Sequence, residues 1–282
     1  MIPVLIIRST DMKDFSTIVV PHDFSPQADR ALQYAIKFFY GQSGKKIHIL
    51  HILDKTASRA AEATALERIQ AIIDNYHGKT SAHLHPKVSR GEIPTAILAA
   101  QQELKSDAII MGTKRSMQAS DNAATNAANL VYDAECPVIV IPDTVDSFKL
   151  KKMVLLVGKE DLMEPEKLSV ALVVARQFNA EIHVLTFYDE GDQDLAGQDV
   201  NEDSLAYYFD RFYTQHIFVK SDDLLEGITR YLDNHDIDLF AIIPNNHARQ
   251  GKPSEGRLTR LLTLQAKIPL LTIDKVNAFT NA

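Results

Sequence analysis

Residues suited to holding a phosphate lie around Gly112, where an apolar segment ends. The run from Asp107 through Met111 reads as a buried strand. A glycine at its carboxyl end removes the side chain at the point where a phosphate can approach the backbone most closely. Thr125 offers a hydroxyl near the start of the next predicted helix, beside free backbone N–H groups. This spacing predicts a phosphate site between the strand and the helix.

A carboxylate follows an earlier apolar strand, in the segment Pro21-His-Asp-Phe-Ser25. In an open α/β sheet the ends of the first and fourth strands border one crevice, so Asp23 and Gly112 can face the same ligand. A carboxylate there accepts hydrogen bonds from a ribose or from a base amino group. Alternatively, Asp23 or Ser25 caps the helix that Pro26 begins. Capping alone and capping combined with ligand binding both stay open.

Strands and helices alternate through the elements that must position these groups, which predicts a parallel sheet with right-handed crossovers. In the first helix, alanine, leucine and phenylalanine residues recur at three- and four-residue intervals and form one apolar stripe. In the second helix, Leu66, Ile69 and Ile73 are expected to face inward. The predicted strands cover residues 17–21, 46–53, 83–89, 107–112 and 136–142, and the later helices cover 57–76, 93–104 and 122–134.

The pattern then restarts with a period of roughly 130 residues. Glu181-Ile-His-Val-Leu matches Lys46-Ile-His-Ile-Leu, and the strand that begins at Asp238 matches the one that begins at Asp107. Ala266-Lys-Ile-Pro-Leu-Leu matches Ala134-Glu-Cys-Pro-Val-Ile. The short polar segment 143–152 reads as the linker. The chain is therefore predicted to contain one α/β module twice.

Met111, Gly112, Thr125 and the Cys136-Pro-Val run resemble the universal stress protein family, and the repeat makes the chain similar to its tandem members. The resemblance implies two doubly wound parallel five-stranded sheets of the Rossmann-like, adenine nucleotide alpha hydrolase-like type. The implied domains are residues 12–143 and a degenerate copy at 152–275. Residues 1–11 form an extension, either an extra strand or an appended leader.

The family's phosphate loop also implies an adenine nucleotide, ATP or AMP, in the first domain, with Mg²⁺ only where the nucleotide brings it. Arg115 and Ala124 replace two of the loop's three glycines. Arg115 either clamps phosphate or obstructs it, and we favour obstruction because backbone freedom is lost at both positions. The implied binding residues are Pro21, His22, Asp23, Ile52, Met111, Gly112, Lys114, Arg115, Thr125 and Asn126.

The second copy is less well equipped for this ligand. Pro244 stands where the loop would start, and Arg257 follows Gly256 where the family has a hydroxyl. We expect this copy to be structural. Family members pair through their last strands, so the two copies can form an intramolecular pseudo-dimer, or the chain can self-associate. The alternative is that the two copies do not pair with each other and have separate partners.

Other sites are weaker. His48, His51, His83 and His85 lack the further ligands that zinc needs, and Cys136 reads as core. The acidic segment 189–203 lacks a complete calcium-loop spacing and reads as a solvated loop over the crevice. A phospho-acceptor receiver is disfavoured, because it needs an acidic pair after the first strand and a Lys-Pro after the fifth, and His22-Asp23 and Pro142-Asp143 supply neither.

Composition narrows the class further. A formal net charge of −7 argues against nucleic-acid or anionic membrane partners. A single cysteine favours a reducing compartment, with the cytoplasm as the default. The first function hypothesis is a non-enzymatic stress-response binding protein that uses a nucleotide as a regulatory ligand for an unknown protein partner, with slow ATP hydrolysis at most. The second is an interaction scaffold in which neither copy binds nucleotide.

Overall fold

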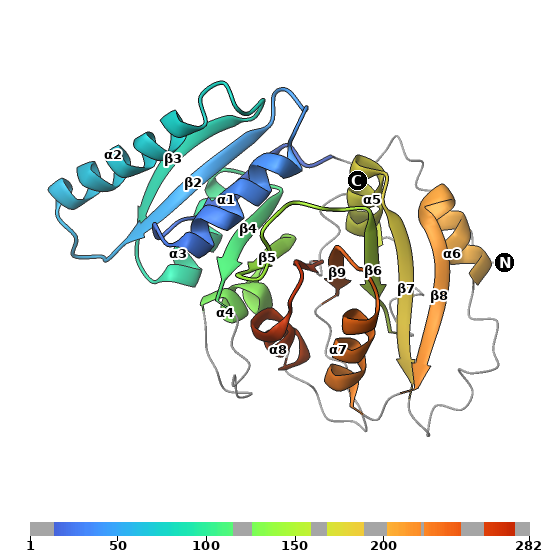
Figure 1. Cartoon of the computed structure of the whole chain (residues 1–282). Helices are drawn as coiled ribbons and strands as arrows, with labels where there is room; N and C mark the ends of the chain where they lie inside the picture. Colours follow the sequence, from blue (N-terminus) through green and yellow to red (C-terminus); the bar gives the residue numbers. More distant parts are fainter. Residues whose placement is uncertain are drawn as a thin grey trace. The chain divides into compact units, whose positions relative to one another are not determined.

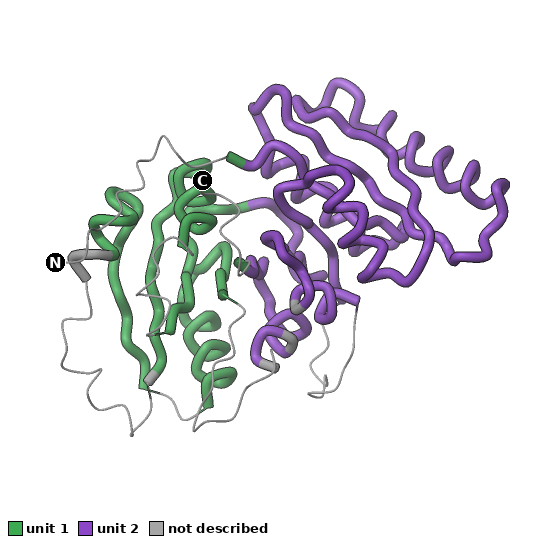
Figure 2. The backbone as a smooth tube through the Cα atoms, turned by 180° about the vertical axis from the view of Figure 1, so that it is seen from behind, with its two compact units in different colours: residues 1–14, 149–254, 273–282 green, residues 15–148, 255–272 purple. Residues whose placement is uncertain are grey.

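The computed structural model describes residues 14–114, 126–158, 168–188, 202–220, 223–243 and 257–273. The chain divides into two compact units, which Figure 2 shows in different colours. Unit 2 comprises residues 15–148 and 255–272, and unit 1 comprises residues 1–14, 149–254 and 273–282.

Unit 2 contains the first copy of the repeat (Figure 1). Its parallel strands lie in the order β3-β2-β1-β4-β5, so β1 and β4 are neighbours although three helices and two strands separate them in sequence. That reversal of strand order is the switch point of a doubly wound sheet. The elements are β1 (Thr17–Pro21), α1 (Pro26–Phe38), β2 (Lys46–Leu53), α2 (Arg59–Asn75), β3 (His83–Arg90), α3 (Ile93–Glu103), β4 (Ala108–Thr113), α4 (Asn126–Asp133) and β5 (Val138–Pro142).

The helices follow from capping and apolar spacing. Ser25 caps α1, its hydroxyl accepting a hydrogen bond from the Ala28 N–H, and Pro26 occupies the first turn, where its missing N–H has no cost. The predicted stripe of α1 is buried as expected. The expectation for α2 is wrong at Leu66, which is 38% exposed, whereas Ile69 is fully buried. Only Ala65 and Ile69 of this helix are buried, so a narrow apolar stripe packs α2 against the sheet.

The end of the second copy belongs to unit 2 as well. Strand β10 (Leu270–Thr272) pairs antiparallel with β5, with Leu271 opposite Ile139. Helix α8 (Arg257–Gln265) packs against α4; α8 buries leucine side chains, and α4 buries alanine, leucine and valine side chains. The predicted boundary at residue 152 separates the two copies in sequence, but the compact unit includes residues 255–272 with the first copy.

Unit 1 repeats the architecture. Strands β9, β6, β7 and β8 pair in parallel in that order, which matches β4-β1-β2-β3 of unit 2. The α/β Rossmann-like fold with a mostly parallel sheet is therefore confirmed. The elements are β6 (Lys152–Leu156), α5 (Ser169–Phe178), β7 (Glu181–Tyr188), α6 (Glu202–Phe209), the 3₁₀ turn η4 (Asp210–Phe212), β8 (Tyr213–Lys220), α7 (Leu224–Asn234) and β9 (Leu239–Ile242).

The repeat extends to individual hydrogen bonds. In unit 2 the buried Asp107 carboxylate accepts from the Ser16 and Thr17 N–H groups at 2.7 and 2.9 Å. In unit 1 Asp238 accepts from the Lys151 and Lys152 N–H groups at 2.7 and 3.0 Å. Each aspartate precedes the fourth strand of its copy and anchors the start of the first. The predicted repeat is thus present in backbone anchoring as well as in residue type.

Candidate functional site

The candidate site lies at the switch point of unit 2. Residues of β1 and β4 pair in register, Val19 opposite Ile109, so the carboxyl ends of both strands are neighbours. The turn from Pro21 to Ser25 leaves β1 at this edge, and Gly112 lies at the end of β4. The two sequence motifs therefore meet at one edge of the sheet, as predicted.

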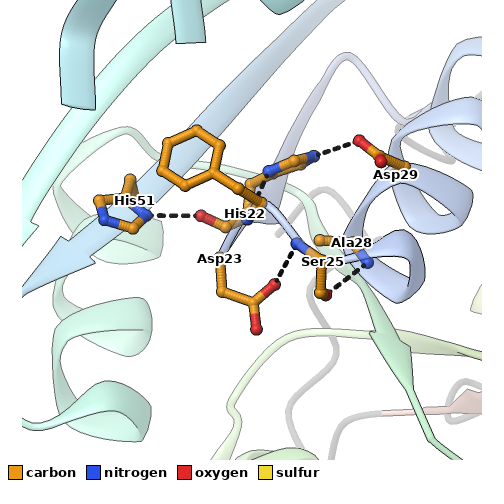
Figure 3. Close-up of polar contacts among 7 residues, drawn as sticks. His22, Asp23, Ser25, Ala28, Asp29 and His51 are labelled. Carbon is orange, nitrogen blue, oxygen red and sulfur yellow. Dashed lines mark hydrogen bonds and ion pairs between the residues drawn. The ribbon is translucent and has the colours of Figure 1, made fainter. Parts of the chain in front are cut away.

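His22 anchors this turn through its backbone and its ring (Figure 3). Its backbone N–H donates to the Leu50 carbonyl at 2.7 Å, and its own carbonyl accepts from His51 Nδ1 at 2.7 Å. The buried ring accepts from the Phe24 N–H through Nδ1 and therefore carries its proton on Nε2, 3.1 Å from Asp29 Oδ1. Burial lowers the pKa of His22, although the Asp29 carboxylate acts in the opposite direction. His22 is thus a neutral structural residue.

Asp23 is the exposed acid of the turn, and it does not cap α1. Its Oδ1 accepts from the Ser25 N–H at 3.0 Å, and in Figure 3 its other oxygen points away from the turn. Burial raises the pKa of Asp23, but the hydrogen bonds from Ser25 outweigh it and leave the pKa below its usual value. Because Ser25 supplies the cap, Asp23 presents an ionised oxygen that the helix does not use.

Phe24, between these two residues, adopts a left-handed backbone conformation with φ of 65°. A bulky side chain is uncommon there and needs compensating contacts. The ring centroid lies 4.5 Å from that of His51 and 3.7 Å from the Arg68 guanidinium carbon. Sequence reasoning missed Phe24 and Arg68 as neighbours, because nothing in their spacing of more than forty residues signals the contact. The stack fixes the side of the turn that faces β2.

Gly112 is required by packing. A Cβ atom built on this residue would lie 2.1 Å from the Gln27 carbonyl oxygen and 2.5 Å from its carbon, both backbone atoms in the first turn of α1. Contacts this short force the backbone to move. The absence of a side chain therefore lets α1 approach β4 closely, and this role is sufficient to explain the glycine without a ligand.

The other predicted residues differ in accessibility. Met111 is buried, with 6% of its surface exposed, so it contributes to the wall from within the core. Pro21 and Ile52 are half-buried, and Lys114 and Asn126 are exposed. Arg115 and Thr125 lie outside the described residues, as do residues 189–201 of the acidic segment, Pro244, Gly256 and residues 1–11.

The corresponding edge of unit 1 carries a different set of groups. Strand register makes Val157 the counterpart of His22 and Gly158 the counterpart of Asp23. Thr186 takes the place of His51, and its hydroxyl donates to the Val157 carbonyl at 3.1 Å. The hydroxyl therefore accepts from Nε2 of the buried His216, 2.9 Å away. Within its described residues, this edge has the backbone hydrogen bonds of the first copy and a glycine, Gly158, at the position of Asp23.

Among the described residues, no three His, Cys, Asp or Glu side chains come together as a metal site. Within the same ranges, no helix is long and apolar enough to cross a membrane.

Comparison with known proteins places this site in a family. The sequence model of the universal stress protein family matches residues 14–142, which span the switch point. Residues 14–142 belong to the universal stress protein family. Universal stress protein G of Escherichia coli O157:H7 is 23% identical over 143 residues, covering 45% of this chain and 99% of the relative. Universal stress protein G of Salmonella typhimurium is 24% identical over the same length and the same shares.

The likeness of fold extends beyond this universal stress protein domain. A universal stress protein from Archaeoglobus fulgidus has a crystal structure that covers 92% of this chain and 98% of its own, with a TM-score of 0.68 and 14% identity. At that identity the match concerns the fold alone. It nevertheless spans both copies of the repeat, so the tandem arrangement has a structural precedent.

Proposed function

We propose that the chain is a stress-response protein whose first domain binds an adenine nucleotide as a regulatory ligand at the carboxyl ends of β1, β2 and β4. The observation that carries the proposal is the exposed, ionised Asp23 carboxylate, which is held by the Ser25 N–H while one oxygen points away from the turn. A carboxylate in this position can accept hydrogen bonds from a ribose or a base amino group.

The residues around Asp23 fit such a ligand. Half-buried Pro21 and Ile52 offer apolar surface to a base, and exposed Lys114 offers a positive charge to phosphates. Thr125 is proposed as a further phosphate contact, whereas Arg115 is expected to obstruct the phosphates. Because the described residues hold no cluster of metal ligands, Mg²⁺ would enter with the nucleotide and rest on its phosphates. A protein partner would distinguish the occupied from the empty domain.

Equilibrium binding of a fluorescent ATP analogue to the full chain tests the proposal. We expect Asp23→Asn to weaken binding about tenfold, because a hydrogen bond to a charged group contributes on the order of 1.5 kcal/mol. The matched control is Asp74→Asn, which removes an equal charge from an exposed residue of α2 and should leave binding within about twofold. If the parent and Asp23→Asn bind the analogue equally well, Asp23 does not contact the nucleotide.

Arg115→Gly decides how the altered phosphate loop acts. If Arg115 obstructs the phosphates, the glycine variant binds the analogue more tightly than the parent; if Arg115 clamps them, it binds more weakly. Absence of binding by both proteins would refute nucleotide binding on this scaffold.

The second candidate is an interaction scaffold without nucleotide. Gly112 favours it, since the approach of the Gln27 carbonyl accounts for that glycine by itself. The stack of Arg68 on Phe24 also covers one side of the turn with protein. If the chain is such a scaffold, neither the parent nor the Asp23→Asn and Arg115→Gly variants bind the ATP analogue.

A further inference from the structure

A concave site lies beside α1 in unit 2. A cleft of about 550 Å³ runs between α1, the end of α2 and the linker that follows β5. Its volume is within the range of small-molecule sites in proteins. Its walls are formed by residues 30–40 of α1 and the turn after it, by Tyr76 and Lys79, and by residues 141–148. Among the described residues, none of those predicted to bind nucleotide lines it.

The body of the cleft is aromatic and apolar. Tyr34 and Phe148 pack with their ring centroids 4.7 Å apart, which fixes the linker against α1. Buried Ile36 and Ile141 lie behind them. At the rim, Tyr40 leaves 72% of its surface exposed, an unusual state for a large aromatic residue beside a cleft. These surfaces suit a flat ring system.

The charge of the cleft is opposite to that of the chain. The full sequence has a formal net charge of −7, yet Arg30, Lys37 and Lys79 line the cleft against a single carboxylate, Asp146. The Asp146 side chain is 89% exposed and lies 3.8 Å from Arg30, so it neutralises that cation weakly. Lys37 Nζ lies 5.2 Å from the Tyr40 ring centroid. Positive charge therefore concentrates beside aromatic surface.

A hydroxyl donor completes the set. Tyr76 is half-buried, and burial raises its pKa, although a hydrogen bond from the Gln33 side chain acts in the opposite direction. The phenol therefore stays protonated at neutral pH and can donate a hydrogen bond to an anion.

We propose that this cleft binds a small aromatic anion, a flat ring system that carries a carboxylate or a phosphate. The ring lies against Tyr40 and Phe148, with the buried Tyr34 supporting Phe148 from within, and the anionic group is held by Lys37 and Lys79. The site is independent of the nucleotide site, because the two share no residue.

The test uses 8-anilinonaphthalene-1-sulfonate as an aromatic anion and N-phenyl-1-naphthylamine as its neutral counterpart, each titrated into the full chain at low salt. The double variant Lys37→Gln/Lys79→Gln removes two exposed cations. It should weaken the sulfonate about tenfold and leave the neutral dye within about twofold. Tyr40→Ser should weaken both dyes, because both use the ring.

The control Lys46→Gln/Lys55→Gln makes the same change in net charge at exposed lysines outside the cleft, and both dyes should then bind as they do to the parent. Competition of 1-naphthoate and of 1-naphthyl phosphate with the sulfonate then shows which anionic group the site prefers. Equal weakening of the sulfonate by the two double variants would reduce the effect to net charge and overturn the proposal. Unchanged binding to Lys37→Gln/Lys79→Gln would overturn it as well.

Discussion

At the residue scale, the second copy differs from the first at the position of His51. Thr186 occupies this position in the second copy and forms a hydrogen bond with the buried His216. The Thr186 hydroxyl gives its single proton to the Val157 carbonyl, so His216 Nε2 must donate to that hydroxyl and Nδ1 must be unprotonated. Among the described residues, Nδ1 has no hydrogen-bond partner and is buried. A proton on Nδ1 would therefore have neither water nor an acceptor, and burial lowers the pKa of His216 to about 4.

This burial makes the stability of unit 1 dependent on pH. The unfolded His216 titrates near its ordinary pKa of 6.5, so between pH 6.5 and about 4 the unfolded chain binds more protons than the folded one. Stability is therefore complete above pH 6.5 and decreases as the pH falls. For this residue the loss at pH 5 has an upper limit of about 2 kcal/mol, because residual solvent screens part of the cost.

His216→Gln should remove this dependence. In urea unfolding at pH 7.5 and pH 5, followed on the transition of unit 1, the parent should lose more free energy of unfolding between the two pH values than the variant. His183 is left intact in both proteins and cancels in the difference, although burial lowers its pKa too. An identical pH dependence in parent and variant would contradict the assignment.

At the element scale, the two aspartates that precede β4 and β9 serve as matched anchors. Asp107 and Asp238 are both less than 8% exposed, and each accepts two backbone N–H groups from the start of its neighbouring first strand. Removing either carboxylate leaves two donors without a partner in a poorly hydrated place, which costs on the order of 3 kcal/mol. The anchors hold the first strands β1 and β6 in register with the fourth strands.

The reciprocal variants Asp107→Ala and Asp238→Ala provide their own controls. Hydrogen exchange measured on peptides should become on the order of 150-fold faster in β1 for the first variant and in β6 for the second. In each variant the corresponding strand of the other unit should exchange as in the parent. Equal acceleration of both strands by either variant would mean that the anchor acts on the whole chain instead of on its own copy.

The elements that the sequence predicts well are those whose apolar period is strong. Strand β2 has its predicted bounds, and the repeat was visible because both copies keep histidine and leucine at matched positions, His48 with Leu50 and His183 with Leu185. Leu66 was placed wrongly because α2 is amphipathic over a narrow stripe. The stack of Arg68 on Phe24 and the contact of Gln27 with Gly112 depend on tertiary distances, to which spacing in sequence gives no guide.

At the scale of the whole molecule, the compact units do not coincide with the sequence repeat. Residues 255–272, which end the second copy in sequence, pack with the first copy as α8 and β10. Strand β10 covers the edge of β5, and Thr272 Oγ1 donates to the Val138 carbonyl at 3.3 Å. A covered edge cannot pair with another chain. This supports the proposal that the copies form a pseudo-dimer within one chain.

Cysteines placed across this strand pair test whether the pairing is intramolecular. Ile139 and Leu271 are opposite residues of an antiparallel pair, and such residues have Cα atoms roughly 4.5–5.5 Å apart, within the range that a disulfide bridges. On a Cys136→Ser background, Ile139→Cys/Leu271→Cys should oxidise to a disulfide within one chain. Ile139→Cys/Leu270→Cys is the control, since neighbouring residues of a strand point to opposite faces and this pair should not react.

Mixing ¹⁴N-labelled and ¹⁵N-labelled chains before oxidation distinguishes the two arrangements. An intramolecular pair gives cross-linked peptides of a single isotope, and the protein runs as a monomer on a non-reducing gel. Peptides that join both isotopes would show that β5 pairs with β10 of another molecule, as in an exchanged dimer. Because β5 offers only one edge to β10, the two outcomes exclude each other within any one molecule, and the isotope ratio measures the fraction of chains in each arrangement.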